Sequence, residues 1–259
     1  SKMAATSRKQ RSEVTTIFFD LDNTLILTKV GDKKACDKVC SLLIENFHLP
    51  ASIAKKATST FLQNFRQCPH NPKFSIVEWR IILWSEALTI YANLAEEVYR
   101  SWLQFRYENL ALTPEVISLL RKLRKTYMLG LITNGTSSSQ WEKVKKLNLH
   151  SYFDCILVSG DHPWEKPHQN IFYEACTTLG VKPRNCVMVG DKLETDILGG
   201  KEASLAATVW ISDTPYTSSS TPRPDFILSS VTQLLQYLPL KQVSVPDLDD
   251  SNSNSSDGS

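Results

Sequence analysis

The sequence lacks several features that would assign a protein to a common class at once. Its 259 residues include 29 Lys plus Arg against 27 Asp plus Glu, which leaves a net charge of +2. Without a strong field of one sign, neither nucleic acid nor an acidic membrane surface is expected as a partner. No apolar run approaches the roughly 20 residues that a membrane helix needs. We therefore expect a small molecule as the partner, while the oligomeric state stays open.

Disulfide and zinc patterns are missing as well. The six cysteines contain no C-x-x-C pair and have apolar neighbours in the sequence. Free thiols in the core of a cytoplasmic protein are therefore expected rather than disulfides. None of the five histidines has the spacing of a zinc site. The start, SKMAATSRKQRSE, is basic and polar without an apolar segment, so we do not expect a secretory leader.

Short apolar runs rich in β-branched and aromatic residues recur along the chain. Runs of this kind, without polar alternation, fit strands that are buried on both faces of a parallel sheet. They are residues 14–19, 128–133, 155–158, 186–189 and 207–211. From about residue 111 they alternate with amphipathic segments, the first of which opens with Thr113 as N-cap and Pro114 as first helical residue. This alternation predicts an α/β fold with a doubly wound, Rossmann-like parallel sheet.

Residues 33–108 interrupt the alternation, because their apolar residues keep helical spacing. Segment 76–91 is apolar almost all round, which predicts a helix buried between its neighbours, with Trp79 and Trp84 in the core. We therefore expect a helical cap domain at 33–108 that is inserted after the first strand of the sheet.

The rest of the chain divides into a core and two tails. Residues 14–32 and 109–240 carry all the predicted strands and form the expected core. Segment 241–259 is rich in Ser, Asn and Asp, so it cannot bury enough apolar surface to offset its ordering entropy. We expect this segment to be disordered, and we expect the same of the polar start at 1–13.

The tripeptide Asp-Leu-Asp occurs twice, and one copy stands where a ligand is expected. Asp20 and Asp22 follow the first predicted strand in VTTIFFDLDNTLI, and open α/β sheets bind ligands at the carboxyl ends of their strands. Asp247 and Asp249 lie in the Ser-rich tail, with no strand to position them. An ionised carboxylate such as Asp20 can attack phosphorus when a cation offsets the charge of the substrate. A second carboxylate two residues later can transfer protons beside it.

Two further strand ends carry polar residues of the right chemistry. The run LGLITNG ends in Thr133 and Asn134, whose polar groups can bind phosphoryl oxygens, although a turn also favours these residues. In WEKPHQNIF, Lys166 precedes Pro167, a residue suited to the first turn of a helix. The ammonium of such a lysine can hold both a nucleophile and a phosphoryl group, although an isolated lysine is more often solvated surface.

A fourth strand end supplies two acids. In CVMVGDKLETDILGG an apolar strand ends at Asp191, and Asp196 follows at the opening of the next helix. Carboxylates in such places suit Mg²⁺, which takes one or two protein carboxylates and keeps several waters.

The four motifs FFDLDNTLI, LITNG, EKP and VMVGDKLETDILGG, in this order and each at a strand end, resemble the haloacid dehalogenase superfamily of phosphotransferases. The resemblance runs from residue 14 to about residue 238, and the helical insertion matches the cap that such enzymes carry after the first motif. It implies an enzyme, a Mg²⁺-dependent phosphatase that forms an aspartyl-phosphate.

The resemblance also implies roles for individual residues. Asp20 would be the nucleophile and Asp22 the general acid and base, with Lys166 as a further catalytic residue. Mg²⁺ would be bound by Asp20, by the backbone carbonyl of Asp22 and by Asp191, with Asp196 in support. The phosphate contacts that it implies are Leu21, Asp22, Asn23, Thr133, Asn134 and Lys166.

Within the superfamily, VMVGDKLETDILGG followed by ATVWI is most similar to phosphatases that act on a sialic acid 9-phosphate, which implies a small phosphorylated sugar acid as substrate. Arg80, in the cap segment SIVEWRIILWSEA, is a candidate for binding a substrate carboxylate, with a salt bridge at the rim as the alternative. Lys192 departs from the pattern, because Thr or Ser is common beside the metal-binding aspartate. A phosphatase of other sugar or metabolite phosphates, a phosphomutase, a dehalogenase and a noncatalytic binding module stay as alternatives.

Overall fold

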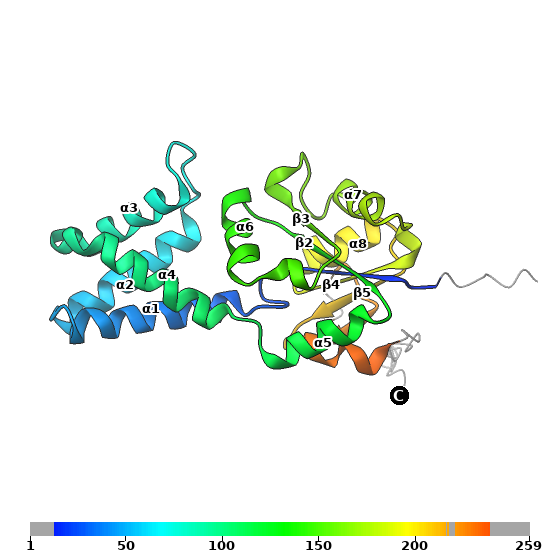
Figure 1. Cartoon of the computed structure of the whole chain (residues 1–259), viewed down its shortest axis with the longest axis horizontal. Coiled ribbons are helices and arrows are strands. Elements are labelled where there is room, and N and C mark those ends of the chain that lie inside the picture. The colour runs from blue at the N-terminus through cyan, green and yellow to red at the C-terminus, as the bar shows by residue number, and fades with distance from the viewer. Residues whose placement is uncertain (1–12, 216, 218–220, 239–259) are drawn as a thin grey trace, which may run out of the picture.

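The structure is a computed structural model that describes residues 13–215, 217 and 221–238. The predictions made for residues 1–12 and for 241–259, a segment that contains the second Asp-Leu-Asp copy, lie outside the described residues. Within the described chain, a bundle of helices lies beside an α/β unit, and the two together give an elongated molecule (Figure 1).

Six parallel strands form the sheet of the α/β unit in the described residues, in the spatial order β3-β2-β1-β4-β5-β6. They are β1 (Thr16–Phe19), β2 (Met128–Thr133), β3 (Cys155–Val158), β4 (Cys186–Gly190), β5 (Ala207–Ile211) and β6 (Phe226–Leu228). The expected doubly wound α/β fold is confirmed. Only β6 escaped prediction, because a strand of three residues carries too short an apolar run to stand out.

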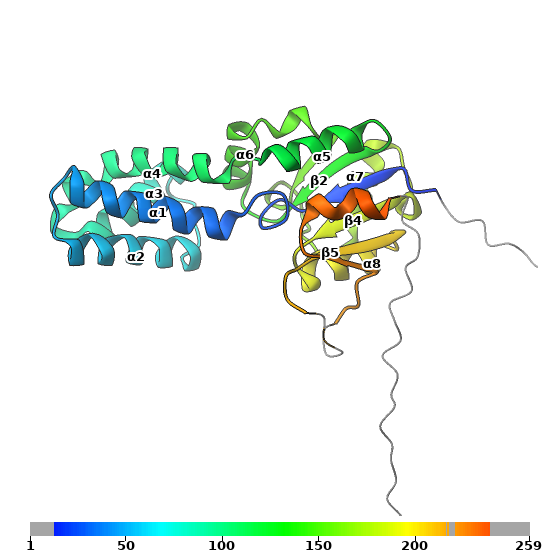
Figure 2. The same cartoon turned by 90° about the horizontal axis from the view of Figure 1, so that it is seen from below.

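Helices cover both faces of this sheet (Figures 1 and 2). On one face Phe19 packs in a core with α5, α6 and η6, and on the other Phe18 packs in a core with α7. Burial on both faces explains why the strands read as continuous apolar runs rather than as alternating ones. The helices are α5 (Pro114–Arg124), α6 (Ser137–Lys146), α7 (Gln169–Leu179) and α8 (Leu198–Glu202), with the shorter turns η2 (Leu149–Ser151), η3 (Ser159–Asp161), η4 (Pro183–Asn185), η5 (Leu193–Ile197) and η6 (Val231–Tyr237).

The helical unit lies between β1 and α5 in the chain and has a hydrophobic core of its own. In that core Phe61 stacks on Trp84, with ring centroids 3.8 Å apart, and meets the edge of Trp102. Helix α1 begins before the expected domain limit of 33, and α4 ends after the limit of 108. The domain limits themselves stay a prediction. The elements are α1 (Thr28–Glu45), α2 (Ala51–Gln67), α3 (Ile76–Leu88), η1 (Thr89–Leu94) and α4 (Ala95–Leu110).

The helix expected between its neighbours at 76–91 is present as α3, but it ends at Leu88 and part of its surface is exposed. The segment divides into α3 and η1, and the side chains of Val77 and Ile90 are 43% and 83% exposed. Helix α3 packs against α2 and α4, so its outer apolar residues face solvent. Trp84 is fully buried as predicted, whereas Trp79 is only partly buried at the margin of the core.

The cysteines are all free, as the sequence indicates. The prediction that they lie in the core fails for Cys68, which is exposed at the end of α2, where the chain leaves the helix for a polar turn. In the part of the chain that the structure describes, no helix is long and apolar enough to cross a membrane.

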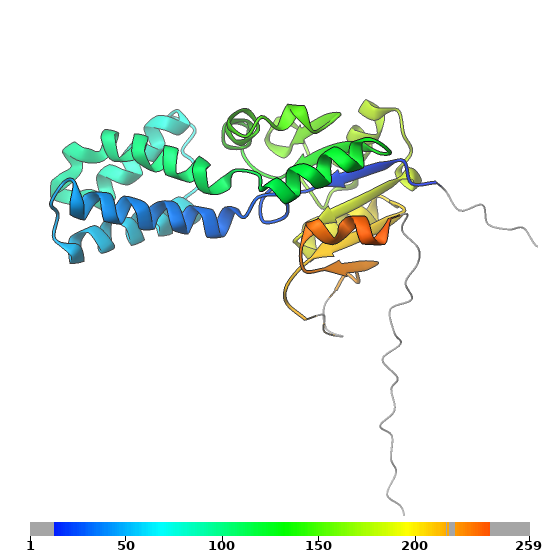
Figure 3. The same ribbon diagram turned by 60° about the horizontal axis from the view of Figure 1, so that its bottom comes forward.

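The carboxyl ends of the strands face the helical unit. Strand β1 runs toward α1, and its neighbours in the sheet run parallel to it (Figure 3). The chain crosses between the two units after β1 and again between α4 and α5. Helix α6 is the core helix that lies next to the helical unit (Figures 1 and 2). Groups at the strand ends are therefore placed between the sheet and the helices of the insertion.

Candidate active site

The site starts at the point where the order of the strands switches direction. Strands β1 and β4 are neighbours, but the chain leaves β1 for β2 on one side and reaches β4 later on the other. Such a switch opens a ligand-binding crevice at the carboxyl ends of the strands. Asp20 follows β1 there, and Asp191 follows β4. The backbone N–H of Asp20 donates to the carbonyl of Val189 at 2.9 Å, which fixes Asp20 beside β4.

Lys166 connects the groups at three strand ends. Its Nζ donates to Asp20 Oδ1 at 2.9 Å, to Asp196 Oδ1 at 2.7 Å and to the carbonyl of Ile132 at 2.8 Å. Burial alone would lower the pKa of Lys166, but the charges of Asp196 and Asp20 outweigh it and raise that pKa. Lys166 is therefore a fixed cation between two carboxylates, in place of the solvated surface lysine that an isolated residue would suggest.

Asn134 holds the segment that carries Lys166. Its Nδ2 donates to the carbonyl of Lys166 at 3.0 Å, and its Oδ1 accepts from the N–H of Lys166 at 3.0 Å. A helix follows this segment, but Pro167 is not in its first turn as expected, because α7 begins at Gln169. The side chain of His168 caps the helix there by accepting from the N–H of Asn170.

Asp196 is buried at the start of the segment after β4. Its side chain is 1% exposed, and its Oδ2 accepts from the backbone N–H of Lys192 at 3.1 Å. A Cβ added at Gly190 would lie 2.2 Å from Cγ and Oδ2 of Asp196, so only glycine leaves room for this carboxylate. The side chain of Lys192 is exposed, and its backbone N–H is what orients Asp196.

Asp20, Asp191 and Asp196 together fit a divalent cation. One oxygen from each lies within 4.8 Å of the others. Among the described residues, Asp191 Oδ1 is buried without a hydrogen-bond partner. Burial, followed by the neighbouring Asp20 carboxylate, raises the pKa of Asp191 to about 8, and burial raises the pKa of Asp196 to about 6. Hard oxygen donors, one buried oxygen without a hydrogen-bond partner and crowded negative charge favour the binding of a divalent cation.

Asp22 is held by residues outside the carboxylate cluster. Its Oδ1 accepts from Thr28 Oγ1 at 2.6 Å and from Lys143 Nζ at 2.8 Å, and its Oδ2 accepts from Gln140 Nε2 at 2.9 Å. Burial raises the pKa of Asp22, but the charge of Lys143 and the hydrogen bonds outweigh it, so that pKa is lowered. Asp22 is therefore ionised at neutral pH in this arrangement.

The other expected phosphate contacts lie at the same strand ends. Leu21 is buried in the turn after β1, and Asn23 in that turn has a φ of 60°, a left-handed conformation that Asn tolerates. The hydroxyl of Thr24 donates to Asp20 Oδ2 at 3.2 Å, so it orients the carboxylate of Asp20. Thr133 is fully buried at the end of β2. The structure thus brings all the core residues singled out in the sequence to one edge of the sheet.

This arrangement coincides with a match to a known family. The model of the haloacid dehalogenase-like hydrolase family matches residues 14–204. The chain belongs to this family. The matched range contains the strand ends that carry Asp20, Thr133 and Asp191, the loop between η3 and α7 that carries Lys166, and the whole helical unit.

Relatives of this haloacid dehalogenase-like hydrolase are phosphatases. The N-acylneuraminate-9-phosphatase of Rattus norvegicus is 40% identical over 232 residues, which cover 86% of this chain and 93% of the relative. The glyceraldehyde 3-phosphate phosphatase of Methanothermobacter thermautotrophicus is 31% identical over 201 residues, with coverages of 74% and 83%. The magnesium-bound crystal structure of the HAD-hydrolase YfnB from Bacillus subtilis matches with a TM-score of 0.57 at 22% identity, covering 88% of this chain and 99% of that one. The predicted superfamily and the predicted phosphatase class are confirmed.

Three residues of α6 belong to the site of this haloacid dehalogenase-like hydrolase but were not predicted from the sequence. Gln140 and Lys143 bind Asp22, and Gln140 Nε2 also donates to Thr133 Oγ1 at 2.6 Å. Glu142 accepts from Arg80 in the helical unit. A signal was available, since Gln140 and Lys143 stand three residues apart in the helix after the Thr-Asn-Gly motif and so share a face.

Arg80 lies in α3 of the hydrolase, where the helical unit meets the core. It helps to line a hollow of about 230 Å³, together with Trp79 from α3 and with Thr136 and Gln140 from the segment after β2. Arg80 is 1% exposed, and its NH1 donates to Glu142 Oε2 at 2.7 Å. The salt bridge that the sequence left as an alternative therefore exists, but it is buried between the two units and not at a rim.

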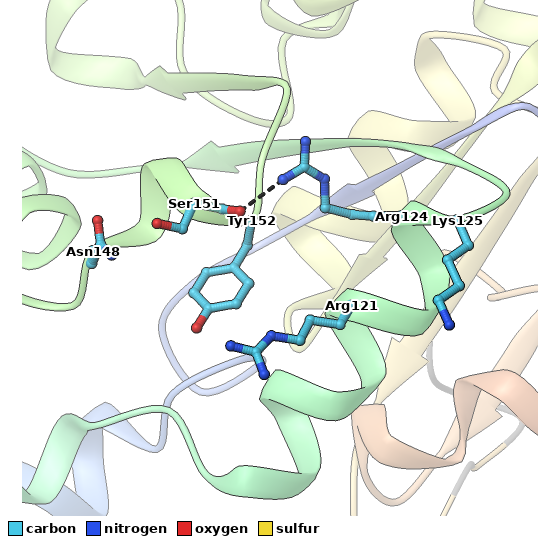
Figure 4. A pocket seen from close by; sticks show the side chains of 6 residues that line it. All are labelled: Arg121, Arg124, Lys125, Asn148, Ser151 and Tyr152. Carbon is cyan, nitrogen blue, oxygen red and sulfur yellow. Dashed lines mark hydrogen bonds between the residues drawn. The ribbon is translucent and has the colours of Figure 1, made fainter.

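A second hollow in the hydrolase, of about 500 Å³, lies between the end of α5 and the segment 148–152 (Figure 4). In it Arg124 donates to the carbonyl of Ser151 at 2.7 Å and to Asp154 at 3.1 Å. Its lining residues are Arg121, Arg124, Lys125, Asn148, Ser151 and Tyr152. None of them contacts the carboxylate cluster, so this larger hollow is not part of the active site.

Proposed function

We propose that this hydrolase is a magnesium-dependent phosphomonoesterase that works through an aspartyl-phosphate on Asp20. The observation that carries the proposal is the contact of Lys166 Nζ with both Asp20 and Asp196 at the carboxyl ends of the strands. A nucleophile that attacks an anionic substrate needs nearby positive charge, and a buried ammonium fixed by two carboxylates supplies it.

In the first step, a carboxylate oxygen of Asp20 attacks phosphorus and the bond from phosphorus to the sugar oxygen breaks. Lys166 and Thr24 orient the carboxylate of Asp20 for this attack. Asp22 gives a proton to the departing alkoxide. Because Lys143 lowers the pKa of Asp22, this carboxylate first takes up a proton from solvent when the negative charge of the bound substrate raises that pKa.

The phosphoryl group is held by polar atoms around the turn after β1. The backbone of residues 21–23 and the hydroxyl of Thr133 bind its oxygens as charge develops. Asn134 and Lys166 act by position and charge, because Asn134 holds the backbone of Lys166 and the ammonium of Lys166 already donates to Asp20, Asp196 and the carbonyl of Ile132. In the second step Asp22 accepts a proton from water, the water oxygen bonds to phosphorus, and the bond to Asp20 breaks. Inorganic phosphate and the free carboxylate of Asp20 result.

The carboxylates of Asp20 and Asp191 and the carbonyl of Asp22 would hold Mg²⁺, with Asp196 in support. The fit rests on Oδ1 of Asp191, which has no hydrogen-bond partner in the described residues, and on the raised pKa values of Asp191 and Asp196. Bound Mg²⁺ supplies charge that offsets the repulsion between these carboxylates and the substrate phosphate.

We infer that the substrate is an N-acylneuraminate 9-phosphate, which would give the enzyme a role in sialic acid biosynthesis. The rat relative supports this inference, because its 40% identity extends over 86% of this chain and includes the helical insertion. Glyceraldehyde 3-phosphate is the alternative that the archaeal relative suggests, at 31% identity. A phosphomutase would use the same residues but return the phosphoryl group to a sugar. We place the enzyme in the cytoplasm, with small phosphorylated metabolites as its partners and with neither nucleic acid nor membrane among them.

Phosphate release from a panel of substrates tests this proposal. The panel contains N-acetylneuraminate 9-phosphate, glyceraldehyde 3-phosphate, a hexose 6-phosphate and p-nitrophenyl phosphate, each with Mg²⁺ and with EDTA. We expect the highest kcat/KM for the sugar acid phosphate, loss of activity in EDTA and recovery when Mg²⁺ is added back. Equal kcat/KM values across the panel would contradict the sugar acid as the specific substrate. Full activity in EDTA would contradict the dependence on Mg²⁺. Formation of a sugar bisphosphate would point to a mutase.

A further inference from the structure

Arg80 has two guanidinium donors without a well-formed hydrogen bond to the described residues, although its charge also acts on the neighbouring hydroxyl of Tyr99. The Nε and one terminal nitrogen of a guanidinium form a fork that matches the two oxygens of a carboxylate. In Arg80 both Nε and NH2 are buried without a hydrogen-bond partner in the described chain, while NH1 donates to Glu142. Buried donors are almost always paired in proteins, so two orphaned donors on one edge point to a ligand.

Arg106 provides an internal comparison. It lies in the same surroundings, since the guanidinium carbons of Arg80 and Arg106 are 5.3 and 5.5 Å from the centroid of the Trp102 ring. Arg106 uses the equivalent edge for a carboxylate, because its Nε donates to Asp32 Oδ1 at 2.8 Å and its NH2 to Asp32 Oδ2 at 3.5 Å. The two arginines on this aromatic wall thus use opposite ends of their guanidinium groups. Arg106 pairs its Nε and NH2 with Asp32 and leaves NH1 without a partner in the described residues, whereas Arg80 pairs NH1 with Glu142 and leaves Nε and NH2 without one.

Glu142 fixes Arg80 without filling this fork. The carboxylate of Glu142 is shared, since Oε2 accepts from Arg80 NH1 at 2.7 Å and Oε1 accepts from the hydroxyl of Tyr107 at 2.6 Å. Arg106 NH1 lies 3.9 Å from the same Oε1. Glu142 therefore holds one end of the Arg80 guanidinium and leaves the Nε/NH2 edge for another acceptor.

The hollow that Arg80 lines adjoins the catalytic residues. Gln140 lines it as well, and Gln140 Nε2 donates to both Asp22 and Thr133. A molecule whose phosphate lies at Asp20 would therefore extend into this hollow toward Arg80. In an N-acylneuraminate 9-phosphate the carboxylate and the phosphate stand at opposite ends of the molecule, which suits a site with a nucleophile at one end and a guanidinium at the other.

We propose that the Nε/NH2 edge of Arg80 binds the carboxylate of the substrate and so selects sugar acid phosphates over neutral sugar phosphates. This proposal rests on the proposed phosphatase function, because it places the phosphate end of the substrate at Asp20. It makes Arg80 a specificity-determining residue and Glu142 the residue that positions it.

The test compares N-acetylneuraminate 9-phosphate with its carboxylate methyl ester, which keeps the phosphate and removes the negative charge at the other end. The wild-type enzyme should prefer the acid in kcat/KM by about 100-fold, since a buried fork discriminates strongly against a ligand that leaves it unpaired. Arg80→Lys keeps the charge beside Glu142 but has no fork. It should lower kcat/KM for the acid by about 100-fold and change that for the ester by less than about 3-fold.

Arg100→Lys is the matched control, because Arg100 is exposed on α4 in a surface pair with Glu96 and should retain wild-type values for both substrates. A thermal melt checks that each variant is folded. Equal use of acid and ester by the wild type overturns the Arg80 proposal even if Arg80→Lys is unstable, while leaving the phosphatase function intact. An equal loss for both substrates in a folded Arg80→Lys also overturns it. Failure of the wild type on both substrates contradicts the proposed function itself, and the Arg80 proposal falls with it.

Discussion

The aspartates of the site owe their different protonation to their nearest neighbours. Asp22 has the ammonium of Lys143 at 2.8 Å, which lowers its pKa, so it is ionised at neutral pH. Asp191 has no cation bonded to it and shares a buried space with Asp20, which raises its pKa to about 8. Two aspartates of one site therefore have pKa values shifted in opposite directions, and the charges beside each contribute to the difference.

Gly190 provides a prediction at the scale of one residue. Gly190→Ala places a Cβ 2.2 Å from the carboxylate of Asp196, so that carboxylate must move away from Lys166. We expect a loss of about 2 kcal/mol in the free energy of unfolding, typical of an overpacked site, and a drop in kcat of at least tenfold. Urea unfolding and steady-state kinetics measure the two effects.

Gly180→Ala is the control for this substitution. Gly180 has a φ of +67°, but a Cβ there meets nothing within 4 Å. This variant should lose about 1 kcal/mol of stability through its left-handed backbone, and its kcat should stay at the wild-type value. A Gly190→Ala enzyme that is as active as Gly180→Ala would show that Asp196 has no need of the space.

At the scale of the elements, α6 links the two units of the protein. Gln140 and Lys143 hold Asp22 of the core, and Glu142 in the same turn holds Arg80 of the helical unit. The Thr-Asn-Gly motif before α6 was found from the sequence because a strand end marks it. The roles of the α6 residues were not found, because they depend on partners such as Asp22 and Arg80 that lie far away in the chain.

The buried pair of Glu142 and Arg80 should make stability depend on pH. Burial raises the pKa of Glu142, but Arg80 outweighs it, so the pKa is below its ordinary value in the folded protein. The stabilisation is therefore complete above the ordinary pKa of about 4.3 and is lost as the pH falls through the lower, folded value. Glu142→Gln should cost about 2 kcal/mol at pH 7, and this cost should shrink below about pH 4.

Urea unfolding at pH 7 and pH 3.5 measures this difference for the wild type and for Glu142→Gln. Glu108→Gln serves as the control, because Glu108 and its partner Lys38 are about half exposed and such pairs contribute little. Its cost should stay below about 0.5 kcal/mol at both pH values. If the cost of Glu142→Gln is the same at both, Arg80 does not hold Glu142 in its ionised form.

At the scale of the whole molecule, the site is built from residues that the chain keeps far apart. Asp20, Thr133, Lys166 and Asp191 meet because a parallel sheet brings the carboxyl ends of its strands to one edge. This regularity is why the core of the site was predictable from short apolar runs and the polar residues after them. The packing of the helical unit was less predictable, because helical spacing shows that α3 has an apolar face but not which neighbours cover it. For this reason the exposure of the Val77 side chain on α3 was not predicted.

The central claim is that Asp20 itself becomes phosphorylated, and trapping the intermediate tests it most directly. The enzyme is mixed with N-acetylneuraminate 9-phosphate and Mg²⁺, quenched within one turnover and treated with borohydride, which reduces an acyl phosphate on aspartate to homoserine. Mass spectrometry of the peptides then locates the change. We predict homoserine at position 20, dependent on substrate and Mg²⁺, with Asp247 unchanged in the other Asp-Leu-Asp copy and with no signal or turnover in folded Asp20→Asn. Phosphate release at the wild-type rate from Asp20→Asn, or homoserine at another aspartate, would contradict the account.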